Sequence, residues 1–318
     1  MNHPALRKLL LIVLTYAVVE ILILTGVIND YLQATLATIC INIILAVSLN
    51  LITGFTGQFS LGHAGFMAIG AYICAMITTR YPSIPGFLLG VFAGALSAAI
   101  IGCLVGLPTL RLRGDYLAIA TLGMAEIIRI IFLNLEITNG AAGLNGIPQF
   151  VNFNWLYLFT AGTVVVITFF LRSSPGRCCI SIREDEIAAE AMGINTTKYK
   201  VLSFTTGAFF AGIAGALYAS YFYFIKPDLF GFLKSIDVLV IVVLGGLGSI
   251  SGSIIAAILL ALISTYLQSF PELRIVIYAA MLVVIMLFRP QGLMGSKELS
   301  LSLFKNWGDK LKLKKERP

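Results

Sequence analysis

Long apolar runs, separated by short polar stretches, fill most of the chain and constrain its fold more than any other feature. A helix that crosses a bilayer needs about 20 apolar residues, and about ten runs of roughly this kind can be marked. The predicted fold is therefore an all-α integral membrane protein, a polytopic bundle of about ten transmembrane spans. The eighth run is short and ends in glycine, so it could be a re-entrant half-helix, and the dense glycines of residues 54–70 allow a broken helix there. The runs lie near residues 8–28, 35–53, 63–79, 86–107, 116–135, 153–171, 201–225, 234–248, 250–268 and 274–288.

The balance of residue types agrees with a membrane protein. Hydrophobic residues make up 58% of the 318 and charged residues only 12%, whereas a soluble domain averages about 45–50% and about 25%. A water-soluble globule of this size would have too few charges to cover its surface, which excludes a soluble enzyme, a nucleic-acid-binding protein and a disordered chain. We expect a transmembrane domain over residues 1–295 and a basic tail over residues 296–318. The first apolar run lacks a small-residue cleavage site and reads as a retained span.

The distribution of basic residues predicts the orientation. Lys and Arg favour cytoplasmic loops. With the N-terminus inside and ten crossings, most Lys and Arg fall on the inner side, and few fall outside. Both termini are therefore expected to be cytoplasmic. The Lys-rich tail could bind anionic lipid or a partner, but the simpler interpretation is that it fixes the topology. The basic residues left outside are Arg80, Lys226, Lys234 and Arg274.

A glycine-dense segment, residues 54–70, does not look like an ordinary lipid-facing helix. It contains five glycines together with Gln58, Ser60 and His63. Non-helical backbone at membrane depth survives only when it is buried in protein or lines a water-filled cavity. The segment therefore predicts part of a translocation pathway or gate, and the alternative is close helix packing through small residues.

Two further segments carry polar residues that could be functional. Glu126 and Arg129 lie three residues apart inside a span and can pair on one helix face, either for conduction or as a structural ion pair near the outer interface. Residues 136–148 form an expected external loop that could meet a partner or a solute, or be an ordinary connector. The polar and glycine residues of that loop are Asn139, Gly140, Gly143 and Asn145.

The longest inner loop, residues 172–200, predicts a short cytoplasmic helix. Acidic residues suit the start of a helix and Gly193 suits its end. One surface of this helix, formed by Ile187, Ala191 and Ile194, could fit a groove in another protein or lie against the chain's own bundle. The candidate docking residues are Glu184, Asp185, Glu186, Ile187, Ala188, Ala189, Glu190, Ala191 and Gly193.

Motifs for an energy source or for catalysis are missing from the sequence. A second glycine-rich stretch, residues 244–252, could be the trace of an internal repeat, but no Walker lysine follows it. No metal cluster, redox motif or catalytic triad is visible, and the five cysteines indicate neither a disulfide framework nor a metal site. The chain is therefore expected to bind no cofactor, to be no enzyme, and to receive energy from a partner at the inner-loop helix.

Five motifs together carry a resemblance to a known family. GFTGQFSLGHAGFMAIGAY, LRGDYLAIATLGMAEIIR, TNGAAGLNGIP, REDEIAAEAMGIN and LFRPQGLMG occur in order. This set resembles the membrane permease subunit of bacterial branched-chain amino acid ABC importers, from about residue 35 to residue 295. Of the two sister permeases in that family, the chain is similar to the one with the longer N-terminal part.

The resemblance implies partners and a substrate. A sister permease would complete a heterodimer in the bacterial inner membrane, two ATPases would bind ATP and Mg, and an external binding protein would deliver leucine, isoleucine or valine. The family's coupling motif E-A-A-x-x-x-G would correspond to Ala188, Ala189 and Gly193, with Ile187 where the Glu would be. The shared pathway would be lined by residues 58–65, with Gly65 among them, and by Thr121 and Gly123 of the fifth span.

Alternative functions remain open on the sequence alone. Related ABC importers carry urea, short-chain amides or other amino acids, and the binding protein selects the solute first. A stand-alone facilitator or secondary transporter is a different class, which co-purification of ATPases would exclude. A membrane enzyme is disfavoured because no catalytic constellation is visible.

Overall fold

The computed structural model describes residues 4–26, 28–112, 114–267, 270–289 and 291–295. The predicted basic tail, residues 296–318, lies outside this described part. Twelve α-helices are present in it: α1 (Pro4–Leu24), α2 (Asp30–Asn50), α3 (His63–Arg80), α4 (Ile84–Thr109), α5 (Asp115–Asn134), α6 (Phe153–Arg172), α7 (Ser174–Glu184), α8 (Glu186–Ala191), α9 (Thr196–Phe222), α10 (Phe232–Gly245), α11 (Ile250–Tyr266) and α12 (Pro271–Phe288). A π-helical turn, Leu51–Phe55, continues α2, and two short strands, β1 (Leu144–Asn145) and β2 (Phe224–Ile225), pair antiparallel.

The prediction of a helical membrane bundle is confirmed, since each of the ten apolar runs forms a helix. In the described part, five helical segments are long and apolar enough to cross a membrane by length and composition: 30–55, 84–109, 115–134, 153–172 and 196–222. The eighth run forms α10, which has only 14 residues. At about 1.5 Å per residue, it is shorter than the roughly 30 Å hydrocarbon core.

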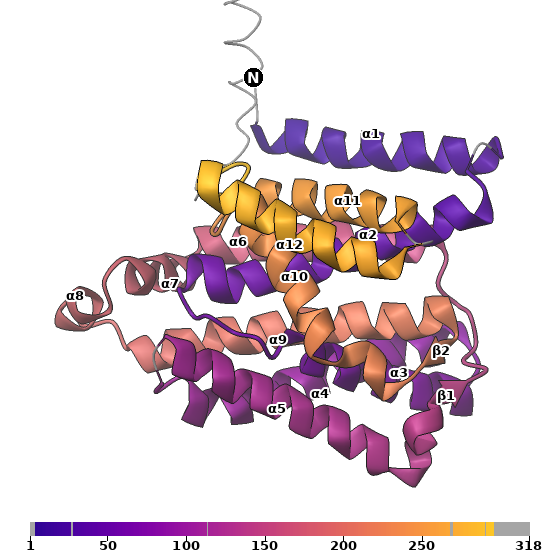
Figure 1. Cartoon of the computed structure of the whole chain (residues 1–318), viewed down its shortest axis with the longest axis horizontal. Helices are drawn as coiled ribbons and strands as arrows, with labels where there is room; N and C mark the ends of the chain where they lie inside the picture. The colour runs from indigo at the N-terminus through magenta and orange to yellow at the C-terminus, as the bar shows by residue number, and fades with distance from the viewer. Residues whose placement is uncertain (1–3, 27, 113, 268–269, 290, 296–318) are drawn as a thin grey trace, which may run out of the picture.

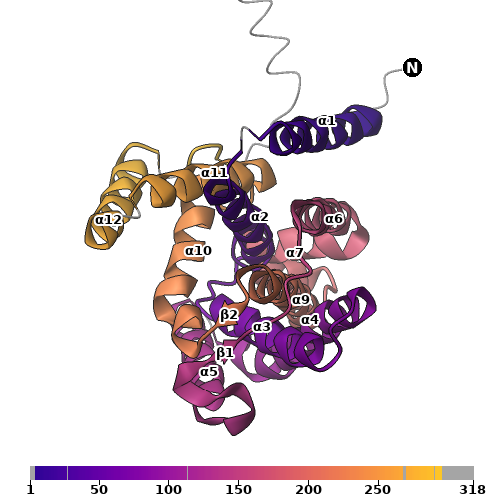
Figure 2. The ribbon, with the colours of Figure 1, turned by 90° about the vertical axis from the view of Figure 1, so that its right-hand side faces the viewer.

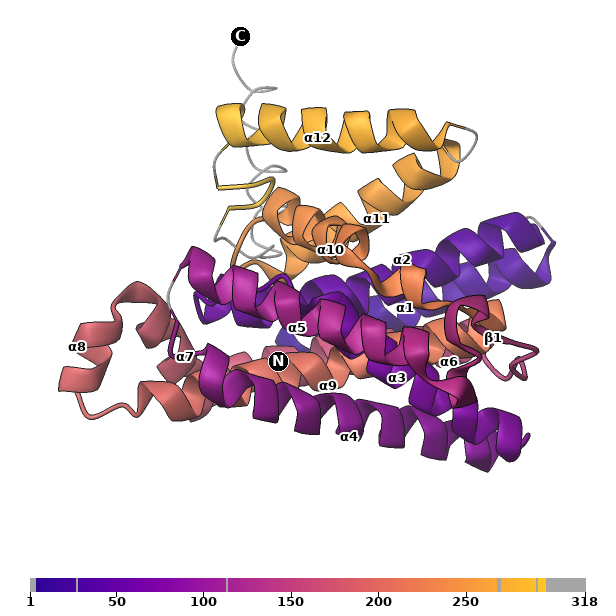
Figure 3. The ribbon, with the colours of Figure 1, turned by 60° about the horizontal axis from the view of Figure 1, so that its bottom comes forward.

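The long helices lie side by side along one axis of the molecule (Figure 1). Helices α7 and α8 project at one end, here called the α8 end, and β1 and β2 lie at the opposite end, here called the β end. The start of α1 and the last turn of α12 both lie toward the α8 end. Figure 3 shows α10 and α11 as an adjacent pair between the bundle and α12.

The densest packing joins α3, α4 and α9. These helices approach so closely that a Cβ atom on Gly70 of α3 would clash with the carbonyl oxygen of Gly212 in α9. Small residues at such contacts let helix backbones meet in a membrane. Helix α2 packs against α6, α9, α10 and α11, and its residues from Ile39 onward are all buried.

Helix α1 is set apart from this core (Figure 2). It meets α6 through polar and ring contacts: Thr15 and Tyr157 share a hydrogen bond of 2.6 Å, and the Tyr16 hydroxyl donates to Asn154 Oδ1 at 3.2 Å. Much of the rest of its described surface is exposed and apolar, for example at Val18 and Ile21. Such a surface suits contact with lipid.

Candidate functional site

The chain between α2 and α3 is unwound inside the bundle, as the glycine-dense segment predicted. After the π-helical turn, residues 56–62 run without regular structure, and α3 begins only at His63. Four of these seven residues are buried. The sequence folds this way because Gly57 adopts a φ of +75°, a conformation that glycine enters without the steric cost of a side chain.

A cluster of four residues, Asn50, Gly54, Arg183 and Gly248, holds this break; we call it the hinge cluster. Asn50 is fully buried at the end of α2. Its Nδ2 donates to the carbonyl of Ser249 at 2.9 Å and to Ser253 Oγ at 2.8 Å, and its Oδ1 accepts from the backbone N–H of Gly248 at 2.9 Å. One side chain thus ties the end of α2 to the loop between α10 and α11.

The two glycine-rich stretches of the sequence meet in the hinge cluster. A Cβ atom on Gly54 would clash with Asn50 Oδ1 and with the backbone nitrogen of Gly248. Glycine at position 54 is therefore required by the close approach of two segments almost 200 residues apart in the chain.

Arg183 joins the hinge cluster from outside the bundle. It lies near the end of α7, and its Nη1 donates a hydrogen bond of 2.7 Å to the carbonyl oxygen of Gly54. A charged donor makes this bond stronger than one between neutral groups. The peripheral helices α7 and α8 are thereby connected directly to the break after α2.

The unwound segment contacts α5 through Thr121. The Thr121 hydroxyl accepts from the backbone N–H of Leu61 at 3.1 Å, and a Cβ on Gly62 would lie 2.7 Å from the Thr121 carbonyl oxygen. Ser60 is buried, and its Oγ accepts from the N–H of Gly62 at 3.4 Å. Gln58 is only 3% exposed, yet neither atom of its side-chain amide has a hydrogen-bond partner among the described residues.

His63 and Gly65 begin α3 in the same buried region. His63 Nε2 shares a hydrogen bond of 2.8 Å with Ser48 Oγ, while its Nδ1 has no partner in the described part of the chain. A Cβ on Gly65 would lie 2.9 Å from the Cα of Ala125, so α3 and α5 touch here. Gln58, Ser60, His63, Gly65 and Thr121 are thus brought together in the structure.

The other three residues expected in the pathway lie elsewhere. Gly123 is exposed, and nothing lies within 4 Å of the position its Cβ would occupy. Glu126 and Arg129 do pair, with 2.7 Å between Oε2 and Nε, and Arg129 also reaches Asp228 Oδ1 at 3.3 Å. This ion-pair group links α5 to the 3-10 turn Pro227–Phe230 near the β end.

The inner-loop helix forms over residues Glu186–Ala191, and a further helix, α7, precedes it that the sequence analysis did not foresee. Asp185 caps α8 by accepting from the N–H groups of Ile187 and Ala188 at 2.9 and 3.0 Å. Gly193 follows with a φ of +81°, as expected for a helix end. The structural role of Asp185 is therefore to cap the first turn of α8.

Two acidic side chains then tie α8 to α9. Glu186 pairs with Lys200 at 2.5 Å, and Glu190 accepts from the hydroxyl of Thr196 at 2.7 Å. Ala189 is buried under the helix, whereas Ile187 is 72% exposed and Met192 is also open. Ala188, Ala191 and Glu184 are exposed as well, and Ile194 is half-buried. Helix α8 therefore presents an apolar surface outward while its inner side is fixed to the bundle.

The expected external loop lies at the β end and is ordered by its own backbone. Asn139 adopts a φ of +57° and its Nδ2 donates to the carbonyl of Gly143 at 3.2 Å. Gly140 lies in a 3-10 turn, and Asn145 pairs with Phe224 across the two strands. The loop is thereby attached to the segment that follows α9.

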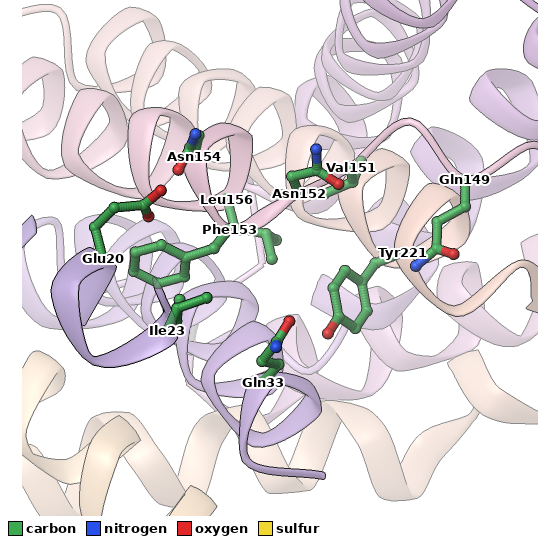
Figure 4. Close-up of a pocket in the computed structure, with 10 residues that line it drawn as sticks. All are labelled: Glu20, Ile23, Gln33, Gln149, Val151, Asn152, Phe153, Asn154, Leu156 and Tyr221. Carbon is green, nitrogen blue, oxygen red and sulfur yellow. The ribbon is translucent and has the colours of Figure 1, made fainter. Parts of the chain in front are cut away.

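Pockets open at both ends of the molecule. One of about 290 Å³ lies at the α8 end, between the unwound segment, the α4–α5 junction and α7–α8. Another, of about 270 Å³, lies near the β end between α1, α2, α6 and α9 (Figure 4). The second pocket has Glu20 as its one charged side chain, with amides from Gln33, Gln149 and Asn152 around it.

Two residues of the hinge cluster were missed by sequence reasoning. Asn50 is a single polar residue near the end of a long apolar run, which was the signal available for it. Arg183 was counted only as one of many basic residues that set the topology. Gly54 and Gly248 were noticed as parts of glycine-rich stretches, but nothing in the sequence showed that they meet.

Comparison with known proteins identifies the relatives of this chain. A family model described as "Branched-chain amino acid transport system / permease component" matches residues 31–286. The chain is similar to the high-affinity branched-chain amino acid transport system permease protein LivM of Salmonella typhimurium, 39% identical over 83% of this chain and 70% of that protein. The Escherichia coli K12 LivM is 40% identical over the same shares. The E. coli K12 permease protein LivH is 28% identical, over 80% of this chain and 92% of its own.

A solved structure also resembles the chain, though weakly. PsaBC from Streptococcus pneumoniae in complex with Fab aligns with a TM-score of 0.47 and 12% identity, over 83% of this chain and 93% of the other.

Proposed function

Because the chain belongs to the family of permease components of branched-chain amino acid transport systems, we propose that it is the membrane-spanning subunit of an ATP-driven importer of leucine, isoleucine and valine. It would form a heterodimer with a sister permease in the inner membrane. Two ATPase subunits would hold ATP and Mg, and an external binding protein would deliver the amino acid. Both termini and the tail would be cytoplasmic.

One observation supports this proposal beyond family membership: the hydrogen bond from Arg183 to the carbonyl of Gly54. Helix α8 offers the exposed Ile187 to a partner, and α7, next to it, holds the break between α2 and α3. A displacement of α7 and α8 by a closing ATPase pair would therefore move backbone at the start of the unwound segment.

The unwound segment is the part of the chain best suited to line the pathway. Gln58, Ser60 and His63 place polar groups inside the bundle, and Thr121 holds the segment against α5. The head group of an amino acid needs such partners, and the interrupted helix leaves backbone N–H and C=O groups unpaired by helix bonds. In this mechanism the hinge cluster converts motion at the α8 end into a change of access.

The test is co-purification in mild detergent, followed by reconstitution in liposomes. We expect a second permease and two ATPases to accompany the chain, and leucine uptake to require ATP and the binding protein. A binding protein loaded with urea or an amide that stimulates hydrolysis instead would change the substrate. A chain that purifies alone and still carries solute would overturn the proposal.

A variant of α8 tests the docking surface. Ile187→Arg places a charge on the exposed apolar side chain and should abolish co-purification of the ATPases. Ile137→Arg is the matched control, because Ile137 is 74% exposed at the β end and should leave the ATPases bound. Loss of the ATPases from both variants, or from neither, would contradict the docking role of α8.

A further inference from the structure

The pocket at the α8 end combines two kinds of wall. The polar side chains that line it include Gln58 and Arg183, together with Glu184 and Asp185 at the α7–α8 junction, here called the polar edge. Apolar side chains line it too: Phe59 from the unwound segment, Leu112 from the α4–α5 junction and Leu117 from the first turn of α5. A ligand that fits would carry charge at one end and a hydrocarbon group at the other.

The polar edge holds hydrogen-bonding capacity that the described residues do not use. The Gln58 amide is buried and both of its side-chain atoms lack partners. Asp185 uses Oδ1 for the α8 cap, and a carboxylate has a second oxygen that can accept. Buried polar groups almost always have a partner, so Gln58 marks a place where a polar ligand would be stabilised.

The charges at this edge select a zwitterion. Arg183 and Lys200 are positive and Glu184, Asp185 and Glu186 are negative, with Lys200 and Glu186 already paired with each other. Neither an anion nor a cation alone would match the remaining groups. A carboxylate can accept from the Gln58 Nε2 group and the guanidinium, while an ammonium group can donate to Gln58 Oε1 and to a carboxylate. The leucine side chains that line the same pocket suit an aliphatic group.

We propose that this pocket binds a branched-chain amino acid from the α8 side and that its occupation inhibits transport. The inference rests on the proposed function, which makes the α8 side cytoplasmic. It adds a regulatory site to the importer: the accumulated product would slow its own uptake.

Inhibition follows from which parts the ligand would join. Gln58 belongs to the unwound segment, Leu112 to the α4–α5 junction, and Asp185 to the start of α8. A bound amino acid would contact all three at once. These are the parts that must move relative to each other if α8 drives the hinge cluster, so a ligand that favours one arrangement opposes the change.

The experiment uses the whole complex of both permeases and both ATPases in liposomes, with ATP inside and binding protein outside. The rate of ATP hydrolysis and the initial uptake of labelled leucine are measured with increasing unlabelled leucine trapped inside. Glycine is the comparison ligand, since it has the same charged groups without a hydrocarbon side chain. We expect leucine, and not glycine, to inhibit hydrolysis.

Two matched variants assign the effect to the pocket. Leu112→Gln replaces an apolar wall residue that is 42% exposed, and Leu107→Gln replaces a leucine that is 48% exposed on the preceding helix, outside the pocket. Loss of one apolar contact should raise the leucine concentration for half-inhibition about tenfold in Leu112→Gln, and Leu107→Gln should behave as the parent.

A binding measurement separates the site from turnover. Labelled leucine is equilibrated with the detergent-solubilised complex without the binding protein, and Gln58→Leu should weaken binding about tenfold through the lost hydrogen bonds. Two results would overturn this inference and leave the proposed function standing. One is leucine uptake that trapped internal leucine does not inhibit, and the other is equal inhibition of Leu112→Gln and Leu107→Gln. Absence of any ATP-driven leucine uptake overturns the proposed function itself.

Discussion

The guanidinium of Arg183 donates a hydrogen bond of 2.7 Å to the carbonyl oxygen of Gly54, across 129 residues of sequence. The donor lies on a helix at the periphery and the acceptor lies on a buried π-helical turn. A backbone carbonyl oxygen can accept a hydrogen bond whatever side chain its residue carries. This hydrogen bond therefore depends on the side chain of Arg183, which supplies the positive charge and the length to reach Gly54.

Removing that contact should uncouple the transporter. Arg183→Gln is too short to reach the Gly54 carbonyl, and a hydrogen bond from a charged group contributes about 1.5–3 kcal/mol. We expect leucine uptake to fall at least about tenfold at unchanged ATPase co-purification. Arg177→Gln, an exposed position on the same helix, is the control. If the two variants transport equally well, the hydrogen bond carries no coupling.

Glycine at position 54 should be needed for stability. Gly54→Ala would drive a methyl group against Asn50 Oδ1 and the Gly248 nitrogen, and overpacking of this kind costs about 1–3 kcal/mol. The melting temperature of the detergent-solubilised protein should fall. Gly123→Ala, where a Cβ meets nothing within 4 Å, should be neutral or slightly stabilising, because alanine favours a helix over glycine. A Gly54→Ala protein that melts like the parent would show that the hinge cluster relaxes easily.

The two ends of the molecule should be accessible from opposite sides of the membrane. Ala141 lies in the loop at the β end and Ala191 lies in α8, and both are exposed. A membrane-impermeant maleimide added to intact cells should label Ala141→Cys above the parental background and leave Ala191→Cys unlabelled. In inverted membrane vesicles the order should reverse. Labelling of both from one side would contradict the proposed orientation.

The thiol of Cys179 should resist alkylation until the pH is high. Burial raises its pKa from 9.0 to about 11, and only the thiolate reacts. At pH 9 the half-buried Cys178 should therefore react faster, as mass spectrometry of the labelled peptides can show. The unfolded thiol ionises from about pH 9 and the folded one only near pH 11, so the unfolded state loses protons first and stability declines across this window. Cys179→Ser should remove that part of the decline, and a parent with no such decline would contradict the raised pKa.

Most of the fold could be predicted because a membrane helix is recognised from the apolar residues of its own segment. Each apolar run became a helix, and Asp185 and Gly193 marked the limits of α8 as capping chemistry requires. Helix α7 was missed because it is polar and carries two cysteines, so hydropathy has no signal there. The glycine-dense segment was recognised as unusual, since its composition is a local property.

The candidate site was less accessible to sequence reasoning because its contacts are long-range. Thr121 does meet the unwound segment, but Gly123, two residues away, lies on the other face of α5. Spacing alone cannot say which face of a helix turns inward when apolar residues surround it. The meeting of Asn50 with Gly248 is likewise a tertiary fact. The roles of these residues in transport stay predictions until the variants above are measured.

The hydrogen bonds made by both ends of the Asn50 amide have a mechanical consequence. Its three hydrogen bonds clamp the end of α2 to the turn between α10 and α11, so the junction has little compliance of its own. If α7 transmits the motion of the ATPases as proposed, that motion would not be absorbed there as local bending. It would displace the end of α2 and the α10–α11 turn together, as one rigid unit built from two distant stretches of sequence.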